Sequence, residues 1–267
     1  MSTYTPSFDV DYQKCGSWDN PINPSINGSS VTFYENGVSA SGRVVSTALY
    51  KNISKITATI DLSKMSQNYV NASYYLISNP TNPAVQPIGD NYCDAGGNRN
   101  DQNAREIDLM ETNGNQVSQT TLHLGDGGSS APQRFEFSFA ETANNSCFNY
   151  AEMLSSPTAE NGLHSLIGYI DVSKPFVSTT SFTYGDSPTM MVEYTQDGKT
   201  VTVYDSSVGN GAYGSGSVDM SDLITTMANG CWIIISQWQG YSPKGPSNGV
   251  WWNDSCGWGQ ECGTGSH

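Results

Sequence analysis

The sequence predicts an all-β protein, a jelly-roll sandwich of two antiparallel sheets. Several segments alternate apolar and polar residues, as strands with one buried face do. Only 13% of the residues are charged, while Gly, Ser, Thr and Asn abound, a composition that favours short strands joined by turns. One segment alone has helical spacing, so two packed sheets are the expected architecture. At 267 residues such a fold is routinely one domain. We expect it to span residues 1–262, with an appended tail at 263–267.

The strands can be placed in order along the chain. Residues 55–62 and 135–139 alternate apolar and polar side chains, so each is expected to pack one face on a core. Residues 190–194 and 200–204 flank Asp197-Gly198, a dipeptide typical of tight hairpins. Residues 232–235 read Trp-Ile-Ile-Ile, which predicts a strand buried on both faces.

The segment between the last two strands predicts a short helix. Leu223, Ile224 and Met227 have the apolar spacing of one helical face. Asp219 or Ser221 could cap its start, and Gly230 is expected to end it.

Residues 106–111, with the sequence EIDLME, place three carboxylates in six positions. On a regular strand Glu106 and Asp108 share one face, while Glu111 falls on the other. A β-bulge at Leu109 or Met110 would return Glu111 to the face of the first two acids, and bulges are common beside active sites. We therefore expect a bulged strand in the middle of a sheet, with all three acids on one side.

Crowded acids repel one another and are costly to bury, so a strand built for stability alone would avoid them. The pattern fits the chemistry of retaining glycosidases, in which an ionised nucleophile and a protonated acid lie about 5 to 5.5 Å apart. A calcium site or a solvated acidic edge is the alternative interpretation of the motif.

Two stretches resemble glycoside hydrolase family 16, which contains the laminarinases and lichenases. Residues 106–115, EIDLMETNGN, are similar to that family's bulged E-x-D-x-x-E signature. Residues 120–123, TTLH, resemble the T-L-H that follows it in laminarinases. The resemblance implies that Glu106 is the nucleophile, that Glu111 is the acid/base, and that Asp108 tunes Glu106. It also implies that His123 lies beside the acid/base, where it could orient Glu111 or bind a sugar hydroxyl; the alternative is a half-buried structural histidine.

Other stretches resemble glycoside hydrolase family 7, the cellulases and cellobiohydrolases. They are residues 74–78 (YYLIS), 92–94 (YCD), 233–238 and 250–254. The resemblance implies the same sandwich, with a concave sheet that forms the substrate cleft. Family 7 enzymes are longer and roof a tunnel with loops, so in this chain we expect an open cleft and cleavage within a polymer.

Sugar rings stack on aromatic side chains, so a glucan cleft should contain Trp and Tyr. Trp238 and Trp252 match the two strand tryptophans of family 7 and are the first candidates for substrate subsites. For each aromatic residue, core packing is the alternative. The further candidates are Tyr75, Tyr92, Trp251 and Trp258.

A formal net charge of -14 disfavours nucleic acid and anionic membranes as partners, because both are bound through Lys and Arg. A neutral β-glucan is compatible with this charge, and we expect a monomer. Arg105 is expected to form a surface ion pair. The longest apolar run, residues 231–235, is too short to cross a bilayer. The motif implies no required cofactor and no catalytic metal, although family 16 mildly favours a structural calcium ion.

Six cysteines, at positions 15, 93, 147, 231, 256 and 262, lack the short paired spacings of zinc sites. We expect three disulfides, of unassigned connectivity. Glycosylation triplets begin at Asn27, Asn52, Asn71, Asn144 and Asn253. With the cysteines, they indicate a secreted, extracellular protein, in a mature form without its signal segment.

The sequence therefore predicts a secreted retaining endo-β-glucanase that cuts β-1,3, mixed β-1,3/1,4 or β-1,4 glucan by double displacement. A transglycosylase on the same scaffold and a non-catalytic, lectin-like carbohydrate-binding sandwich are the alternatives.

Overall fold

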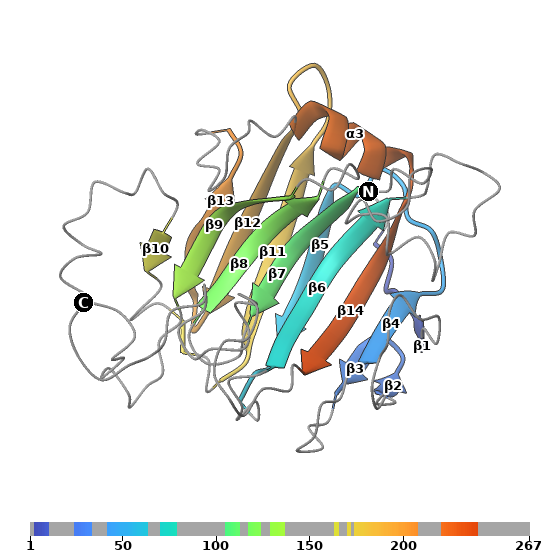
Figure 1. The fold of residues 1–267 in the computed structure, drawn as a ribbon, viewed down its shortest axis with the longest axis vertical. Helices are drawn as coiled ribbons and strands as arrows, with labels where there is room; N and C mark the ends of the chain where they lie inside the picture. The colour runs from blue at the N-terminus through green and yellow to red at the C-terminus, as the bar shows by residue number, and fades with distance from the viewer. Residues whose placement is uncertain are drawn as a thin grey trace.

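The structure is a computed structural model, and it shows two β-sheets packed face to face with one helix across an end (Figure 1). It describes residues 3–10, 24–33, 42–63, 70–78, 105–112, 117–123, 129–136, 163–165, 170–171, 174–207 and 220–239.

The larger sheet has eight strands, antiparallel except for the β9/β10 pair. In spatial order they are β1 (Phe8–Val10), β4 (Gly42–Ser46), β14 (Cys231–Gln239), β6 (Val70–Ser78), β7 (Glu106–Thr112), β8 (Val117–His123), β9 (Ser129–Glu136) and β10 (Leu163–Ser165). The smaller sheet has four antiparallel strands in the order β13 (Lys199–Asp205), β12 (Thr189–Gln196), β11 (Phe176–Thr183) and β5 (Lys55–Ile60). A separate hairpin pairs β2 (Ser25–Asn27) with β3 (Ser30–Thr32).

One hydrophobic core lies between the two sheets. The larger sheet contributes Ile107 and Leu122, and the smaller sheet contributes Phe176, Val192 and Tyr204. Side chains along β11 and β12 alternate between buried and partly exposed, as strands with one core face do. The predicted all-β sandwich is therefore confirmed.

The strands that were predicted from a local sequence pattern lie at or near the predicted residues. Strand β5 covers most of residues 55–62, and β12 and β13 form the expected hairpin. At its turn Asp197 and Gly198 have φ values of 50° and 75°, the left-handed pair that a type I′ turn requires. Strand β9 ends at Glu136, and the rest of the strand predicted at 135–139 lies outside the described residues.

Strand β14 is buried on both faces, as predicted. Ile233 and Ile234 point to opposite sides of the sheet and are 5% and 3% exposed. Ile233 joins the core between the sheets, while Ile234 packs with Val45, Tyr75 and Ile77 on the other face. The larger sheet is therefore covered on both sides at this strand.

The predicted helix is α3 (Met220–Asn229), which lies across one end of the sandwich (Figure 1). It contacts β6 from the larger sheet and β12 from the smaller one. Its inner face buries Met220, Leu223, Ile224 and Met227. Arg105 forms an ion pair with Asp222 on its outer face, with 3.1 Å between Nε and Oδ2, so the surface ion pair expected for Arg105 is confirmed. Asp219, one of the predicted caps, lies outside the described residues.

The expectation of three disulfides is wrong for Cys231. Its thiol is free, 1% exposed, and part of the core between the sheets. Burial raises its pKa to about 12, which keeps it an unreactive thiol. The other five cysteines lie outside the described residues. In the part of the chain that the structure describes, no helix combines the length and apolar character that spanning a bilayer requires.

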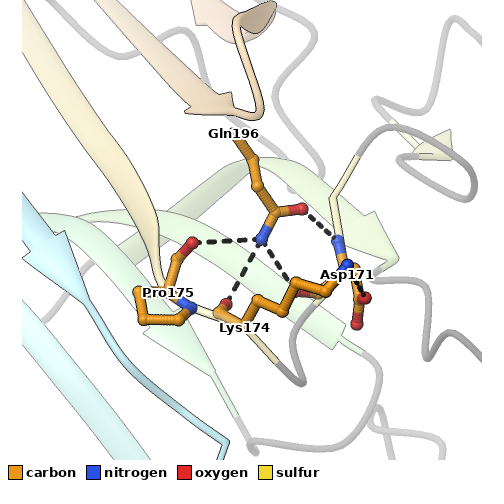
Figure 2. A network of polar contacts seen from close by, with 4 residues as sticks. All are labelled: Asp171, Lys174, Pro175 and Gln196. Atoms are coloured by element: carbon orange, nitrogen blue, oxygen red, sulfur yellow. Dashed lines mark hydrogen bonds and ion pairs between the residues drawn. The ribbon is translucent and has the colours of Figure 1, made fainter.

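A side-chain clamp fixes the segment that leads into β11 (Figure 2). Gln196, at the end of β12, accepts a hydrogen bond from the Asp171 backbone N–H through its Oε1 at 2.6 Å. Its Nε2 donates to the carbonyl oxygens of Asp171, Lys174 and Pro175 at 2.8, 3.3 and 3.2 Å. Gln196 is 7% exposed, so these backbone groups have little access to water if the amide is removed.

We predict that Gln196→Glu destabilises the protein, more at pH 7 than at pH 4. A carboxylate would face three carbonyl oxygens instead of donating to them, and this burial would raise its pKa above the unfolded value. The variant therefore regains stability as the pH falls and the group is protonated. Urea unfolding at both pH values measures the effect, expected to be about 1 to 3 kcal/mol at pH 7. Gln196→Leu is the control, with a loss that should not depend on pH.

Gly230 ends helix α3 in a backbone conformation that other residues avoid. Its φ is +152°, and a Cβ at this position would lie 2.9 Å from Leu49 Cδ2. We predict that Gly230→Ala lowers the free energy of unfolding by roughly 1 to 3 kcal/mol. Gly185→Ala is the control for the backbone contribution, because Gly185 has φ +126° and a Cβ added there would meet no atom within 4 Å. An equal loss in both variants would show that the contact with Leu49 is unimportant.

Candidate active site

Strand β7 carries the bulge that the acidic motif predicted. Its pairing with β8 runs regularly through Asp108↔Thr121, shifts, and resumes at Glu111↔Gln119. Its pairing with β6 shifts at the same place, from Asp108↔Tyr75 to Met110↔Tyr74. Between these pairs strand β7 therefore has one more residue than β6 and β8, and this extra residue defines a β-bulge.

The bulge places all three acids on one face of the larger sheet. Opposite Glu106, Asp108 and Glu111 lie Ile77, Tyr75 and Ser73 of β6, which alternate along a regular strand and so share a face. Ile107, Leu109 and Met110 all belong to the core on the opposite face. Two consecutive core residues, Leu109 and Met110, are what returns Glu111 to the side of the other acids. We call this side of the larger sheet the acid face.

Pairing across four strands arranges the acid face in three rows. The first contains Trp232, Ile77 and Glu106, the second contains Val45, Ile234, Tyr75 and Asp108, and the third contains Arg43, Ser236, Ser73 and Glu111. Strand β7 lies between β6 and β8, with further strands beyond each, so the acids are central in the sheet and not at an edge.

The three acids lie in different environments. Glu106 and Asp108 are 4% and 2% exposed, whereas Glu111 is partly exposed. The Ser73 hydroxyl donates toward Glu111 Oε1 over 3.5 Å, which is long for a hydrogen bond to a carboxylate. Two of the carboxyl groups are therefore enclosed by the protein, while solvent reaches the third.

Tyr75 lies on the acid face, but its burial differs from what the sequence suggested. The side chain is 1% exposed and packs with Val45, Ile77 and Ile234. A ring covered in this way has no free face on which a sugar could stack. We therefore assign Tyr75 to the packing that supports the acids and not to a substrate subsite.

Burial strongly raises the pKa of the Tyr75 phenol, so the side chain is neutral. Arg43 acts in the opposite direction, Glu106 and Asp108 raise the pKa further, and a polar interaction with Ser236 lowers it. The phenol is therefore electrostatically coupled to a cation and to two of the three acids.

Two side chains of the acid face have no counterpart among the residues predicted from the sequence. Arg43, on β4, is 2% exposed, and Trp232 packs partly exposed against the cluster around Tyr75. Neither Arg43-Val44-Val45 nor Trp232-Ile233-Ile234 alternates polar and apolar residues. No local pattern therefore indicated the face on which Arg43 and Trp232 lie, or the strands that bring them to the acids.

The resemblance implied that His123 lies beside Glu111, but across β7 and β8 the Cα partner of His123 is Glu106, and that of Glu111 is Gln119. Trp238 lies on β14 as the partner of Asn71 on β6. The remaining predicted aromatic residues lie outside the described part of the chain: Tyr92, Trp251, Trp252 and Trp258. Among the described residues, no three histidine, cysteine or carboxylate side chains are arranged to share a metal ion.

Comparison with known proteins gives structural similarity at low identity. No family model matches the chain, and no curated protein matches it. A family 7 cellobiohydrolase from Daphnia pulex aligns with a TM-score of 0.48 and 15% identity, over 82% of this chain and 67% of its own. A family 16 protein of the mixed linkage glucan locus of Bacteroides ovatus, in complex with its G4G4G3G product, aligns with a TM-score of 0.37 and 14% identity, over 75% and 62%.

A glycoside hydrolase family protein from Mycobacterium thermorestibile aligns with a TM-score of 0.35 and 12% identity, over 76% of this chain and 59% of its own. The first two of these structures belong to the two families that the sequence motifs resemble. At TM-scores below 0.5, these similarities carry no information about the activity of this chain.

We predict that Tyr75 contributes to the loss of stability in alkali. A phenol whose folded pKa is raised stabilises the fold below its unfolded pKa of about 10, and this contribution is lost as the pH rises further. Tyr204, whose pKa burial raises to about 12, behaves in the same way. Tyr75→Phe cannot ionise, so its alkaline unfolding midpoint should lie above that of the parent. Ultraviolet difference absorbance of tyrosinate, followed with circular dichroism, measures the midpoint. Tyr4→Phe, at a site 75% exposed, should leave it unchanged.

Proposed function

We propose that this protein is a retaining glycoside hydrolase that cuts β-glucan within the chain. The observation that carries the proposal is the bulged strand, which gathers Glu106, Asp108 and Glu111 on one face in the middle of the larger sheet. A strand that served only stability would place apolar or neutral side chains at these positions, because two of them are almost fully buried.

We assign each acid one role in the double displacement. Glu106, buried on the acid face, attacks the anomeric carbon and forms a glycosyl-enzyme ester. Glu111, which solvent reaches, protonates the leaving oxygen and then takes a proton from the water that hydrolyses the ester. Asp108 lies between them on the same strand and tunes Glu106 through their shared environment.

His123 and the aromatic residues complete the proposal. His123 is the Cα partner of Glu106 across the sheet, and its proposed role is to orient a carboxylate or bind a sugar hydroxyl. Trp238, Trp252, Tyr92, Trp251 and Trp258 are proposed as sugar subsites, because stacking on aromatic rings suits a neutral polymer. The linkage would be β-1,3, mixed β-1,3/1,4 or β-1,4.

We also propose that the protein is secreted and acts as a monomer. Three of the glycosylation triplets begin at described residues, Asn27, Asn52 and Asn71, and the side chains of Asn27 and Asn52 are exposed. Exposure is required for a glycan at either site.

We predict that Glu106→Gln abolishes hydrolysis while the fold persists. Reducing-sugar release from β-1,3, mixed-linkage and β-1,4 glucans measures turnover, and the anomer formed first, observed by NMR, shows whether configuration is retained. Glu111→Ala should also lose activity on glucan, and added azide should restore turnover in part on an aryl glucoside, because its leaving group needs no protonation and azide needs no general base. Glu193→Gln is a matched control, since Glu193 also lies beside a bulge, but on the smaller sheet.

The alternatives give different outcomes. Oligosaccharides longer than the substrate would indicate transglycosylation. Binding of glucan without any product would indicate a lectin-like protein. Full activity in Glu106→Gln would remove Glu106 from its role.

A further inference from the structure

We propose that Arg43 is a positioning residue of the acid face, whose buried guanidinium offsets the negative charge of the acids on β7. Its importance for turnover rests on the function proposed above, whereas its effect on the stability of the charged acids does not.

Arg43 lies on the acid face and not in the core between the sheets. It pairs with Ser236 of β14, two residues from the pair formed by Val45 and Ile234. Val45 and Ile234 pack with Tyr75, so Arg43, with the same alternation as Val45, belongs to the same face. At 2% exposure it is among the largest fully buried side chains of the protein.

The phenol of Tyr75 links Arg43 to the acids. It is electrostatically coupled to Arg43, to Glu106 and to Asp108, so the cation and both carboxylates act on one buried side chain. Tyr75 itself is neutral and adds no charge to the group.

The charged groups that face this cluster can be named strand by strand. Strand β1 contributes Asp9, which pairs with Val45 and is exposed. Strands β14 and β6 contribute the neutral side chains of Ser236, Ser73 and Tyr75. Strand β7 contributes the three acids, and β8 has His123 at the partner position of Glu106. Among the described side chains of the acid face, Arg43 is therefore the permanent cation.

A buried carboxylate without a compensating charge is protonated instead of remaining ionised. Glu106 is almost fully buried, so removal of Arg43 would favour its protonated form. A protonated Glu106 cannot attack an anomeric carbon. In a chain with 11 Lys and Arg against 25 Asp and Glu, a cation buried at this face is the group that can prevent this.

The test compares Arg43→Gln and Arg43→Lys with the parent. Loss of the cation matters only while the acids are ionised, so Arg43→Gln should lose more stability in urea at pH 7 than at pH 4. The acidic limb of kcat/KM should move up by about one pH unit or more. Arg43→Lys keeps the charge and should show much smaller changes in both. Arg105→Gln, which removes the exposed ion pair with Asp222, controls for loss of a guanidinium.

The outcomes separate the two proposals. An equal stability loss at both pH values, with an unmoved acidic limb, would overturn the role of Arg43. A pH-dependent loss in a parent that cleaves no glucan would support the role of Arg43 and contradict the proposed hydrolase. If Arg43→Gln does not fold, it is combined with Glu106→Gln and Asp108→Asn. Recovery of the fold would support the proposal, and continued failure to fold would overturn it.

Discussion

The extra residue in β7 is the constraint on which the acid face depends. A regular strand would place Glu111 in the core beside Ile107, where a carboxylate would be buried among apolar side chains. With the bulge, Leu109 and Met110 both enter that core and Glu111 returns to the acid face. The bulge therefore has two effects. It adds the apolar side chain of Met110 to the core, and it adds Glu111 to the acid face.

The acids in turn set requirements on strands that are distant in sequence. Two almost fully buried carboxylates need donors, neutral neighbours or a cation near them. Tyr75 supplies a neutral, rigid ring beside them, and Arg43 supplies the charge from β4, two strands away from β6. The acid face is therefore assembled from four strands, and no single segment of the sequence contains it.

The distance in sequence between interacting residues explains which features could be predicted from the sequence. Helix α3 and the hairpin at Asp197-Gly198 are encoded by neighbouring residues, so periodicity and turn chemistry predicted them. The bulge in β7 was predicted from the spacing of its three acids. The place of Arg43 and the burial of Tyr75 depend on which strands become neighbours, and no local pattern states that. The free thiol of Cys231 could not be predicted either, because its burial depends on which face of β14 packs against the core between the sheets.

The positions of Arg43 and Tyr75 on the acid face depend on the register of β14. The strand is apolar on both sides, so its own sequence does not distinguish the correct register from one shifted by a residue. Contacts at the first residues of β14 fix its register. Backbone hydrogen bonds join Cys231 and Tyr50 in both directions, at 2.8 and 2.9 Å. The Ile233 N–H donates to Ser46 Oγ at 3.1 Å.

Gly230 allows helix α3 to end directly before this anchor. If β14 slipped by one residue, Ser236 would leave the row of Arg43, Ser73 and Glu111, and Ile234 would leave Tyr75. Contacts at the start of β14, far along the strand from Glu111, therefore determine whether the cation and the acids share one face.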